Sequence, residues 1–306
     1  MTPRPAHVLR ALALPIPALL ALVLLALPAP ASAQSREDGA PPASLGLSDA
    51  VRASAWGPTA LYFNPAGLSR VHRVIAEVRY GYLDGRDGNT VGAAVIDGHT
   101  NQIVAMGIAY DYISSAIDGV DRDGHSFRGG ISTQYVSGDF ALFAGVGVRY
   151  LDLTVGTSKD AFPDTDAWTI DAGLMFDVAQ RIRLGVVGQN LLETDSDEAR
   201  RKLGLGLTLT FDALELSGDL EIDLADRIDG AVLDYAFGAQ YAIQGAFFLR
   251  AGVLVDRVLE QERISGGFGY GTKEWALDIG YSSAVEKPEQ MQFGVGFKYS
   301  PEMPAY

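Results

Sequence analysis

The sequence predicts an all-β protein, a transmembrane β-barrel of 14 antiparallel strands. Three observations lead to this prediction. Apolar and polar residues alternate from about Val74 to Tyr299, and the gaps between the alternating segments are short and long in turn. After residue 33 the chain has no apolar run near the roughly 18 residues that a helical span needs. If this part of the chain crosses a membrane, it therefore crosses as strands.

The first 33 residues have the pattern of a secretory signal peptide. Arg4 and Arg10 make the start basic, an apolar run extends from Ala11 to Pro30, and Ala31-Ser32-Ala33 offers a small-x-small cleavage site. The alternative is a membrane anchor, but the run contains four prolines and ends at the cleavage pattern. We therefore expect cleavage after residue 33.

The composition excludes several kinds of site. The chain contains no cysteine, which excludes disulfides, thiolate metal sites and a lipid-modified N-terminal cysteine. Its formal net charge of −14 becomes −16 when the two positive charges of Arg4 and Arg10 are removed with the signal peptide. So acidic a chain is a poor partner for nucleic acid, and no nucleic-acid partner is predicted.

The mature chain divides into three regions. Residues 34–72 combine a polar tether with a short helical or irregular segment, which begins at about residue 45 and ends in a sharp turn. Residues 73–300 carry the period-two pattern of strands, and residues 301–306 form a short C-terminal tail.

The alternation gives each predicted strand two unlike faces. Between residues 203 and 211 every second residue is leucine or phenylalanine, with glycine or threonine between them. Trp168, Ile170 and Leu174 likewise share one face, and Asp171 lies on the other. We assign the uncharged faces to lipid, because a charged side chain at the bilayer midplane costs about 2–4 kcal/mol.

The connections distinguish a membrane barrel from the alternative, a soluble β-sandwich. Even-numbered gaps are short, such as Ser137-Gly138 and Ala179-Gln180, and are typical of hairpin turns. Most odd-numbered gaps, such as 113–124 and 152–166, are longer and polar. Outer-membrane barrels have short turns in the periplasm and longer loops outside. An even strand number then leaves both termini periplasmic, and 12 strands remain the alternative to 14.

Charged residues on the second face are predicted to line the lumen. These residues are Arg79, Arg149, Asp171, Arg183, Glu215, Asp219, Glu221 and Arg250. The acidic residues among them could form a cation path, but the simpler interpretation is a solvated lining that is partly paired with the arginines. Tyrosine and tryptophan near the strand ends agree with aromatic girdles at the two interfaces.

The sequence offers little for catalysis or metal binding. After residue 33 the histidines are His72, His99 and His125, and neither G-x-S-x-G nor H-E-x-x-H occurs. His125 and Ser126 are neighbours at a strand start, so their side chains point to opposite faces, which disfavours a dyad. The aspartates at 118, 121 and 123 lack the downstream Glu of an EF-hand loop. We predict no enzyme, no cofactor and no metal site.

The last strand carries a pattern that is similar to the assembly signal of outer-membrane barrels. Gln292, Gly294, Phe297 and Tyr299 follow one another at strand spacing as a polar residue, a glycine and two aromatic residues. The alternative is an ordinary strand. Together with a signal peptide and 14 strands, the pattern predicts the barrel assembly machinery, outer-membrane lipid and lipopolysaccharide as partners.

The segment before the first strand resembles a known family. The run SDAVRASAWGPTALYFNPAGLSRV, with Asn64-Pro65-Ala66-Gly67 near its end, is similar to the N-terminal signature of the FadL-type long-chain fatty acid transporters and the related PorV/PorQ proteins. The segment Gly185 to Leu191 resembles a strand on the PorV side of the group. The resemblance implies a 14-stranded barrel in which residues 45–66 form a hatch in the lumen, with the Asn64-Pro65-Ala66 turn as its pivot.

Two functions are implied for a barrel of this FadL/PorV type in the bacterial outer membrane. The first is passive transport of small hydrophobic compounds. The second is a PorV/PorQ-like scaffold that conducts nothing and binds or shuttles secreted proteins. External loops of 6–15 residues add weight to the second, because they leave little room for an outer groove. Passive transport is nevertheless the predicted function, and the scaffold is its alternative. Hydrophobic small molecules or secreted proteins are the corresponding partners.

Overall fold

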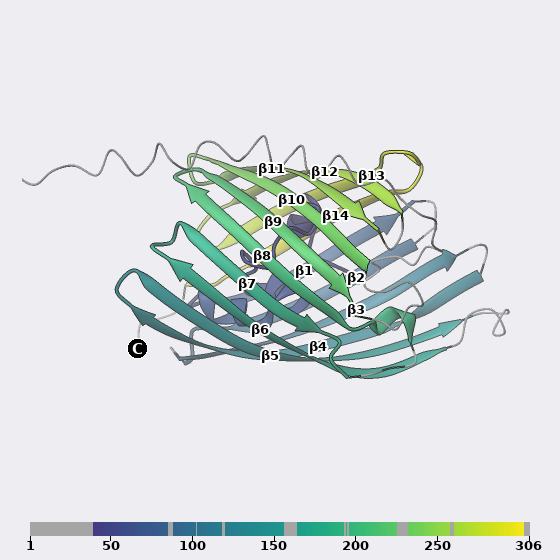
Figure 1. The fold of residues 1–306 in the computed structure, drawn as a ribbon, viewed down its shortest axis with the longest axis horizontal. Coiled ribbons are helices and arrows are strands. Elements are labelled where there is room, and N and C mark those ends of the chain that lie inside the picture. Colours follow the sequence, from purple (N-terminus) through teal and green to yellow (C-terminus); the bar gives the residue numbers. More distant parts are fainter. Residues whose placement is uncertain are drawn as a thin grey trace, which may run out of the picture.

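The barrel closes where its first and last strands pair. In this computed structural model each of the 14 strands pairs antiparallel with its neighbours in sequence, and β1 pairs with β14 (Figure 1). The predicted fold class is therefore confirmed, and the alternatives of 12 strands and of a soluble sandwich are excluded.

The structure describes residues 39–84, 88–101, 103–117, 120–155, 164–192, 194, 196–224, 232–257 and 260–302. The predicted signal peptide (1–33) and residues 303–306 of the predicted tail lie outside the described residues. The strands are β1 (Val74–Leu83), β2 (Gly88–Asp97), β3 (Val104–Ile117), β4 (Val120–Ser137), β5 (Phe140–Val155), β6 (Thr165–Val178), β7 (Ile182–Gln189), β8 (Lys202–Phe211), β9 (Leu214–Asp223), β10 (Val232–Ile243), β11 (Phe247–Asp256), β12 (Gln261–Gly271), β13 (Trp275–Ala284) and β14 (Met291–Tyr299).

The helices of the described chain are all short. They are α2 (Pro42–Leu45), α3 (Ala60–Phe63) and the 3-10 helices η1 (Gly57–Thr59), η2 (Pro65–Arg70) and η3 (Asp197–Ala199). None of them is long and apolar enough to cross a membrane.

The polarity of the barrel is reversed relative to a water-soluble protein. The outward face is apolar and exposed, with Trp168 at 60% and Leu207 at 41% relative accessibility, whereas the inward-facing Arg149 and Asp171 are buried. The alternation of the sequence produces this arrangement because successive side chains of a strand point to opposite faces. An apolar exterior of this kind matches lipid and not water.

The two ends of the barrel differ in the length of their connections. At the short-turn end the strands are joined by residues 98–103, 138–139, 179–181, 212–213, 244–246 and 272–274, close to the predicted turns. At the long-loop end one prediction was wrong. Residues 113–124 are not a loop, because β3 and β4 stay paired as far as Ile117 and Val120. The polar residues of this stretch predicted a loop. Beyond the membrane, however, water surrounds both faces of the paired strands, so both faces can carry polar residues. Asp121 and Asp123 accordingly lie on β4, and Asp118 is outside the described residues.

The turn between β6 and β7 has a backbone that its residues disfavour. Ala179 and Gln180 have φ of 54° and 56°, the left-handed conformation at both central positions of a hairpin turn. The double substitution A179N/Q180G should therefore raise the free energy of unfolding by about 1–2 kcal/mol, measured as a higher urea midpoint of the barrel in detergent. Gly138 (φ 58°) provides the converse: its Cβ would meet no atom within 4 Å, so Gly138→Ala should lower the midpoint through the backbone alone. Unchanged midpoints in both variants would contradict this account.

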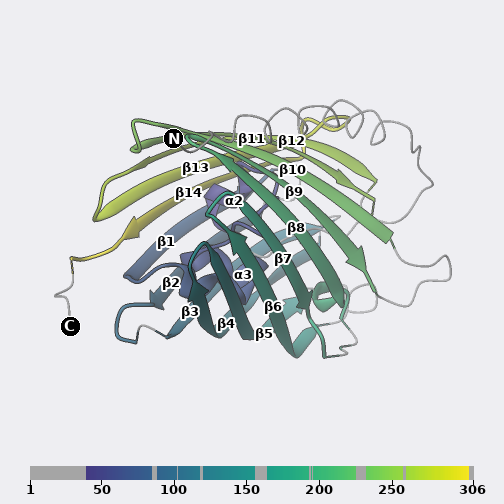
Figure 2. The same ribbon diagram turned by 60° about the vertical axis from the view of Figure 1, so that its left-hand side comes forward.

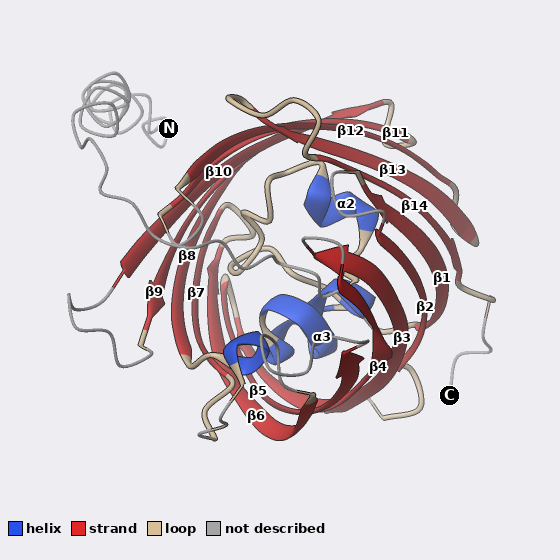
Figure 3. Ribbon diagram, turned by 90° about the vertical axis from the view of Figure 1, so that its right-hand side faces the viewer, coloured by secondary structure: helices blue, strands red, loops and turns tan. Residues whose placement is uncertain are grey.

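Residues 39–70, which we call the hatch, lie inside the barrel (Figures 2 and 3). Nearly every described residue from Pro41 to Ser69 is buried, and Gly39 already lies in the lumen, where its carbonyl accepts a hydrogen bond from Arg79 Nε (2.7 Å). Helix α2 packs against β12–β14, and η2 packs against β3–β6. The hatch thus spans the lumen from one wall to the other.

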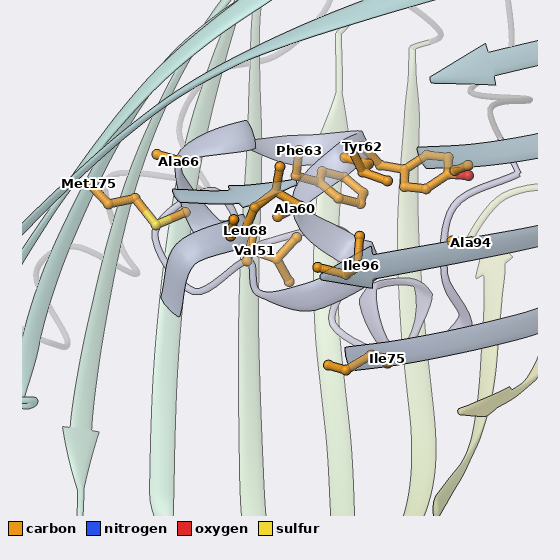
Figure 4. Packing of buried hydrophobic residues seen from close by; sticks show 14 of the residues in the cluster. Val51, Ala60, Tyr62, Phe63, Ala66, Leu68, Ile75, Ala94, Ile96 and Met175 are labelled. Carbon is orange, nitrogen blue, oxygen red and sulfur yellow. The ribbon is translucent and has the colours of Figure 1, made fainter. Parts of the chain in front are cut away.

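The hydrophobic core of the molecule lies between the hatch and the wall (Figure 4). Val51, Leu61 and Leu68 of the hatch pack there with inward-facing Ile96 of β2 and Met175 of β6. These inward apolar residues interrupt the otherwise polar inner face. Burying them against the hatch stabilises its position, because a fully buried aliphatic side chain contributes about 1.5–3 kcal/mol.

Candidate functional site

The Asn64-Pro65-Ala66-Gly67 turn joins the hatch to the wall. Asn64 Oδ1 accepts a hydrogen bond from Ala66 N (3.2 Å) and so caps η2. Its Nδ2 donates to Arg52 O (3.0 Å) and to Leu174 O of β6 (3.3 Å). One buried amide therefore holds two hatch segments and a strand together. The role of this turn as a pivot stays a prediction.

Inward-facing glycines allow the hatch to approach the wall at backbone distance. We call eight of them the contact glycines, and a Cβ added to any of the eight would lie 3.1 Å or less from a hatch atom: Gly145, Gly173, Gly185, Gly206, Gly238, Gly252, Gly267 and Gly280. Each belongs to a different strand between β5 and β13. Glycine within a strand is expected where another backbone approaches closely.

From Pro42 to Leu68, the contacts of the hatch with the wall glycines follow the barrel in reverse strand order. Pro42 lies against Gly280 of β13, Leu47 against β10 and β11, and Ala53 against β8. Pro65 then lies against β5, and Leu68 reaches Gly130 of β4. Along this run of glycine contacts the earlier hatch residues thus meet the later strands. Gly39 and Tyr62, outside the run, contact β1 and β3 instead.

A buried cluster of charges fixes the centre of the hatch to β9. Arg52 donates through its backbone N (2.8 Å) and Nη1 (3.3 Å) to Asp219 Oδ2, and its Nη2 is paired with Glu221. Lys202 Nζ of β8 also pairs with Glu221 (2.9 Å). Asp219 and Glu221 were predicted as lumen lining, and the structure places both beside a cation of the hatch.

A second cluster holds Tyr62, on the opposite side of the hatch. Its hydroxyl donates to Asp111 Oδ2 of β3 (2.6 Å), and Arg79 of β1 bonds both groups. The guanidinium carbons of Arg79 and Arg128 each lie 4.6 Å from the centroid of the Tyr62 ring. Two cation–π contacts and two charge-assisted hydrogen bonds therefore act on one side chain.

Other predicted lumen charges form pairs along the wall. Arg183 Nη2 pairs with Glu215 Oε2 (2.8 Å), as the partial pairing of lumen charges predicts. Arg250 Nη1 pairs with Asp278 Oδ1 (2.7 Å), a partner that the sequence analysis did not name. All four side chains of these pairs belong to the inward-facing residues of their strands.

Arg149 and Asp171 lie toward the long-loop end. Arg149 Nη1 donates to Glu198 O (3.3 Å), and Asp171 Oδ1 accepts from Asn190 N (2.8 Å). Both bonds fix the backbone of the connection between β7 and β8. These two residues therefore support a loop.

The predicted assembly-signal residues lie on both faces of β14. Phe297 and Tyr299 are exposed on the outside, at 44% and 48%, whereas Gly294 is buried beside Pro42 of the hatch. Gln292 faces the cavity above the hatch. The structure thus gives Gly294 a packing role, and recognition by the assembly machinery stays a prediction.

Sequence reasoning missed the hatch side of the site. Arg52 and Tyr62 lie in a segment without periodicity, so no pattern marked them. Asp111, Arg128 and Lys298 were available from alternation, because each is charged and lies on an otherwise uncharged strand segment. Some strands have leucines on the outward face and glycines on the inward face, as Gly206 shows. Such glycines were a further sequence signal that another segment packs closely against the inner wall.

The hatch leaves a cavity on each of its two faces. The upper cavity, toward the long-loop end, has a volume of about 100 Å3 and is lined by Tyr62, Phe63, Lys202 and Glu221 among others. The lower pocket, toward the short-turn end, has a volume of about 290 Å3, and Trp56 belongs to its lining. Aromatic side chains of the hatch therefore face both ends of the barrel.

Comparison with known proteins identifies the architecture. No protein-family model and no curated protein matches the chain. Among solved structures, the monoaromatic hydrocarbon channel CymD is similar with a TM-score of 0.64 at 15% identity, over 88% of this chain and 100% of that chain. The toluene transporter TodX of Pseudomonas putida is similar with a TM-score of 0.58 at 12% identity, over 89% of this chain and 99% of that chain.

At such identities the likeness shows the fold. The chain is a β-barrel of the outer-membrane type with its lumen occupied by an N-terminal hatch. More particularly, its architecture is that of the FadL-type barrels, so the resemblance seen in the run that contains Asn64-Pro65-Ala66-Gly67 is confirmed at the level of the fold. These neighbours give no support to the alternative of a PorV/PorQ-like scaffold.

Proposed function

We propose that this protein is a passive outer-membrane channel that admits small hydrophobic compounds past its hatch. The observation that carries the proposal is the pair of cavities on the two faces of one buried plug. Tyr62 and Phe63 border the upper cavity and Trp56 borders the lower pocket, only a few residues away along the chain. Movement of the hatch would then connect the two spaces.

The fold comparison supports the class of solute. CymD and TodX are described as a monoaromatic hydrocarbon channel and a toluene transporter. Both cavities of this chain place aromatic rings next to hydrogen-bonding groups, which is the lining expected for a small apolar or amphipathic ligand. A passive channel uses no energy input, so passage in either direction follows the concentration gradient of the compound.

We further propose the orientation and export route. Residues 1–33 direct export through the Sec pathway and are cleaved, and the short turns face the periplasm. The end of β14 at Tyr299 lies at the short-turn end, together with the start of β1 at Val74. The C-terminal segment would then be periplasmic, as the parity of the strands predicts.

Uptake into vesicles tests the channel. Vesicles with a lipopolysaccharide outer leaflet and loaded with the full-length mature barrel should take up a monoaromatic hydrocarbon or a fatty acid faster than empty vesicles. A variant without residues 45–66 should also pass small sugars, because removal of the hatch leaves the polar inner wall facing an open pore. Equal uptake by empty and loaded vesicles would overturn the proposal.

A further inference from the structure

The lower pocket combines aromatic rings with hydroxyl groups. Gly245 and Thr272 belong to its lining, so it lies between the β10–β11 and β12–β13 turns at the mouth of the barrel. Trp56 of the hatch, with 45% relative accessibility, and Phe248 of β11 line it as well. Its volume of about 290 Å3 exceeds the roughly 150 Å3 of an apolar cavity that holds benzene. The pocket therefore has room for a substituted ring.

Each ring of the lower pocket has a cation beside it, and the two cations share a carboxylate. Lys298 Nζ lies 5.6 Å from the centroid of the tryptophan ring, and Arg250 Cζ lies 5.6 Å from that of the phenylalanine ring. Asp278 accepts hydrogen bonds from Arg250 (2.7 Å) and from Lys298 (2.8 Å). Lys298 is also 3.6 Å from Glu77. Glu77 is also 3.5 Å from Arg79. Both cations of the pocket are thus engaged by carboxylates.

We propose that the lower pocket is a binding site for a neutral monoaromatic compound that carries one hydroxyl group. The ring packs between Trp56 and Phe248, and the hydroxyl group exchanges hydrogen bonds with the polar lining, which includes Ser54 and Thr59 of the hatch. A ring with a carboxylate is rejected, because both cations are already engaged by Asp278 and the lining adds the further carboxylate of Glu215.

This assignment deepens the proposed function and rests on it. A compound that has passed the hatch reaches this pocket last, before it leaves at the short-turn end. The pocket therefore acts as an exit site with a chemical preference of its own, and a hydroxylated ring is retained there longer than a plain hydrocarbon, because the latter leaves the polar lining without a partner.

The small number of tryptophans makes a direct test possible. The chain has three, and Trp168 and Trp275 lie on the outward face of the barrel. In a W168F/W275F variant of the full mature barrel in detergent, Trp56 is the sole tryptophan. 4-Bromophenol, which is neutral near neutral pH, should quench its fluorescence with saturation. 4-Bromobenzoate should need about tenfold higher concentration, because it brings a like charge to Asp278.

Two matched variants control the test. In a W56F/W275F barrel the remaining Trp168 reports quencher dissolved in the detergent, and its quenching should rise linearly. Phe248→Leu, combined with W168F/W275F, keeps an apolar side chain but removes the ring, and should weaken saturation about fivefold. Linear quenching of Trp56, equal binding of the benzoate, or no effect of Phe248→Leu would each overturn the site. Vesicle uptake is measured separately, so saturable quenching without uptake would contradict the channel and leave the site in place.

Discussion

Replacing Arg52 with alanine should open the barrel to ions. The substitution leaves Asp219 buried without its cation and leaves Glu221 with Lys202 as the partner that the structure records. Removing one member of a buried pair costs about 3–5 kcal/mol, which shifts the balance between the bound and displaced hatch by about two to four orders of magnitude. The single-channel conductance of the variant in planar bilayers should therefore rise well above that of the native barrel.

A surface arginine and a compensated variant control this prediction. Arg181 is exposed in the β6–β7 turn, and Arg181→Ala should leave the conductance unchanged. The double variant R52M/D219L removes the uncompensated charge and keeps the Glu221–Lys202 pair, so it should restore a low conductance. If Arg52→Ala conducts no better than Arg181→Ala, the cluster does not hold the hatch.

Adding a single methyl group at Gly145 should also displace the hatch. Its Cβ would lie 2.5 Å from both the carbonyl carbon and the carbonyl oxygen of Pro65. Neither backbone can move freely, because Asn64 and Ser132 bind the same turn, Ser132 Oγ donating to Ala66 O (2.8 Å). We expect a loss of about 3 kcal/mol in hatch binding. Trypsin should then cleave after Arg52, which is buried in the native barrel, about a hundredfold faster.

The neighbouring strand offers a matched glycine for this experiment. Gly129 of β4 points outward, and its Cβ would meet Val148 Cγ1 at an ordinary 3.4 Å. Trypsin should therefore cleave the Gly129→Ala variant at the native rate. The electrophoretic mobility of the unheated protein shows whether each variant is a folded barrel. Identical cleavage rates in two folded variants would contradict the close contact at Gly145.

The barrel could be predicted from the sequence because lipid and lumen impose unlike demands on alternate residues. Leu205 and Leu207 face outward and Gly206 inward, as the period-two pattern requires. The extent of β3 and β4 could not be predicted, since beyond the bilayer both faces of a ladder meet water and the pattern disappears. Asp123 was therefore assigned to a loop, although it lies on β4.

The fold of the hatch could not be predicted from the periodicity of the sequence. Its fold depends on contacts with distant strands, as for Arg52 with Asp219 and Tyr62 with Asp111. Its helices of three to six residues are too short to show a helical period. Only the similarity of the run around Asn64 to a known family placed this segment in the lumen. The partners of Asp219 and Glu221 were missed for the same reason, because the alternation gave them wall arginines as partners and the structure gives them Arg52.

The reverse order in which the hatch contacts the strands has a consequence for biogenesis. Leu68 and Gly130 are separated by a short stretch of chain, whereas Pro42 and Gly280 are separated by most of the protein. Closing a short loop costs less entropy than closing a long one, so the contacts near the first strands form at the lowest cost and those of α2 form only as the last strands arrive. The hatch can therefore bind strand by strand to a growing sheet and need not be threaded through a finished pore. In a chain that lost its final strands, α2 would have no wall to bind.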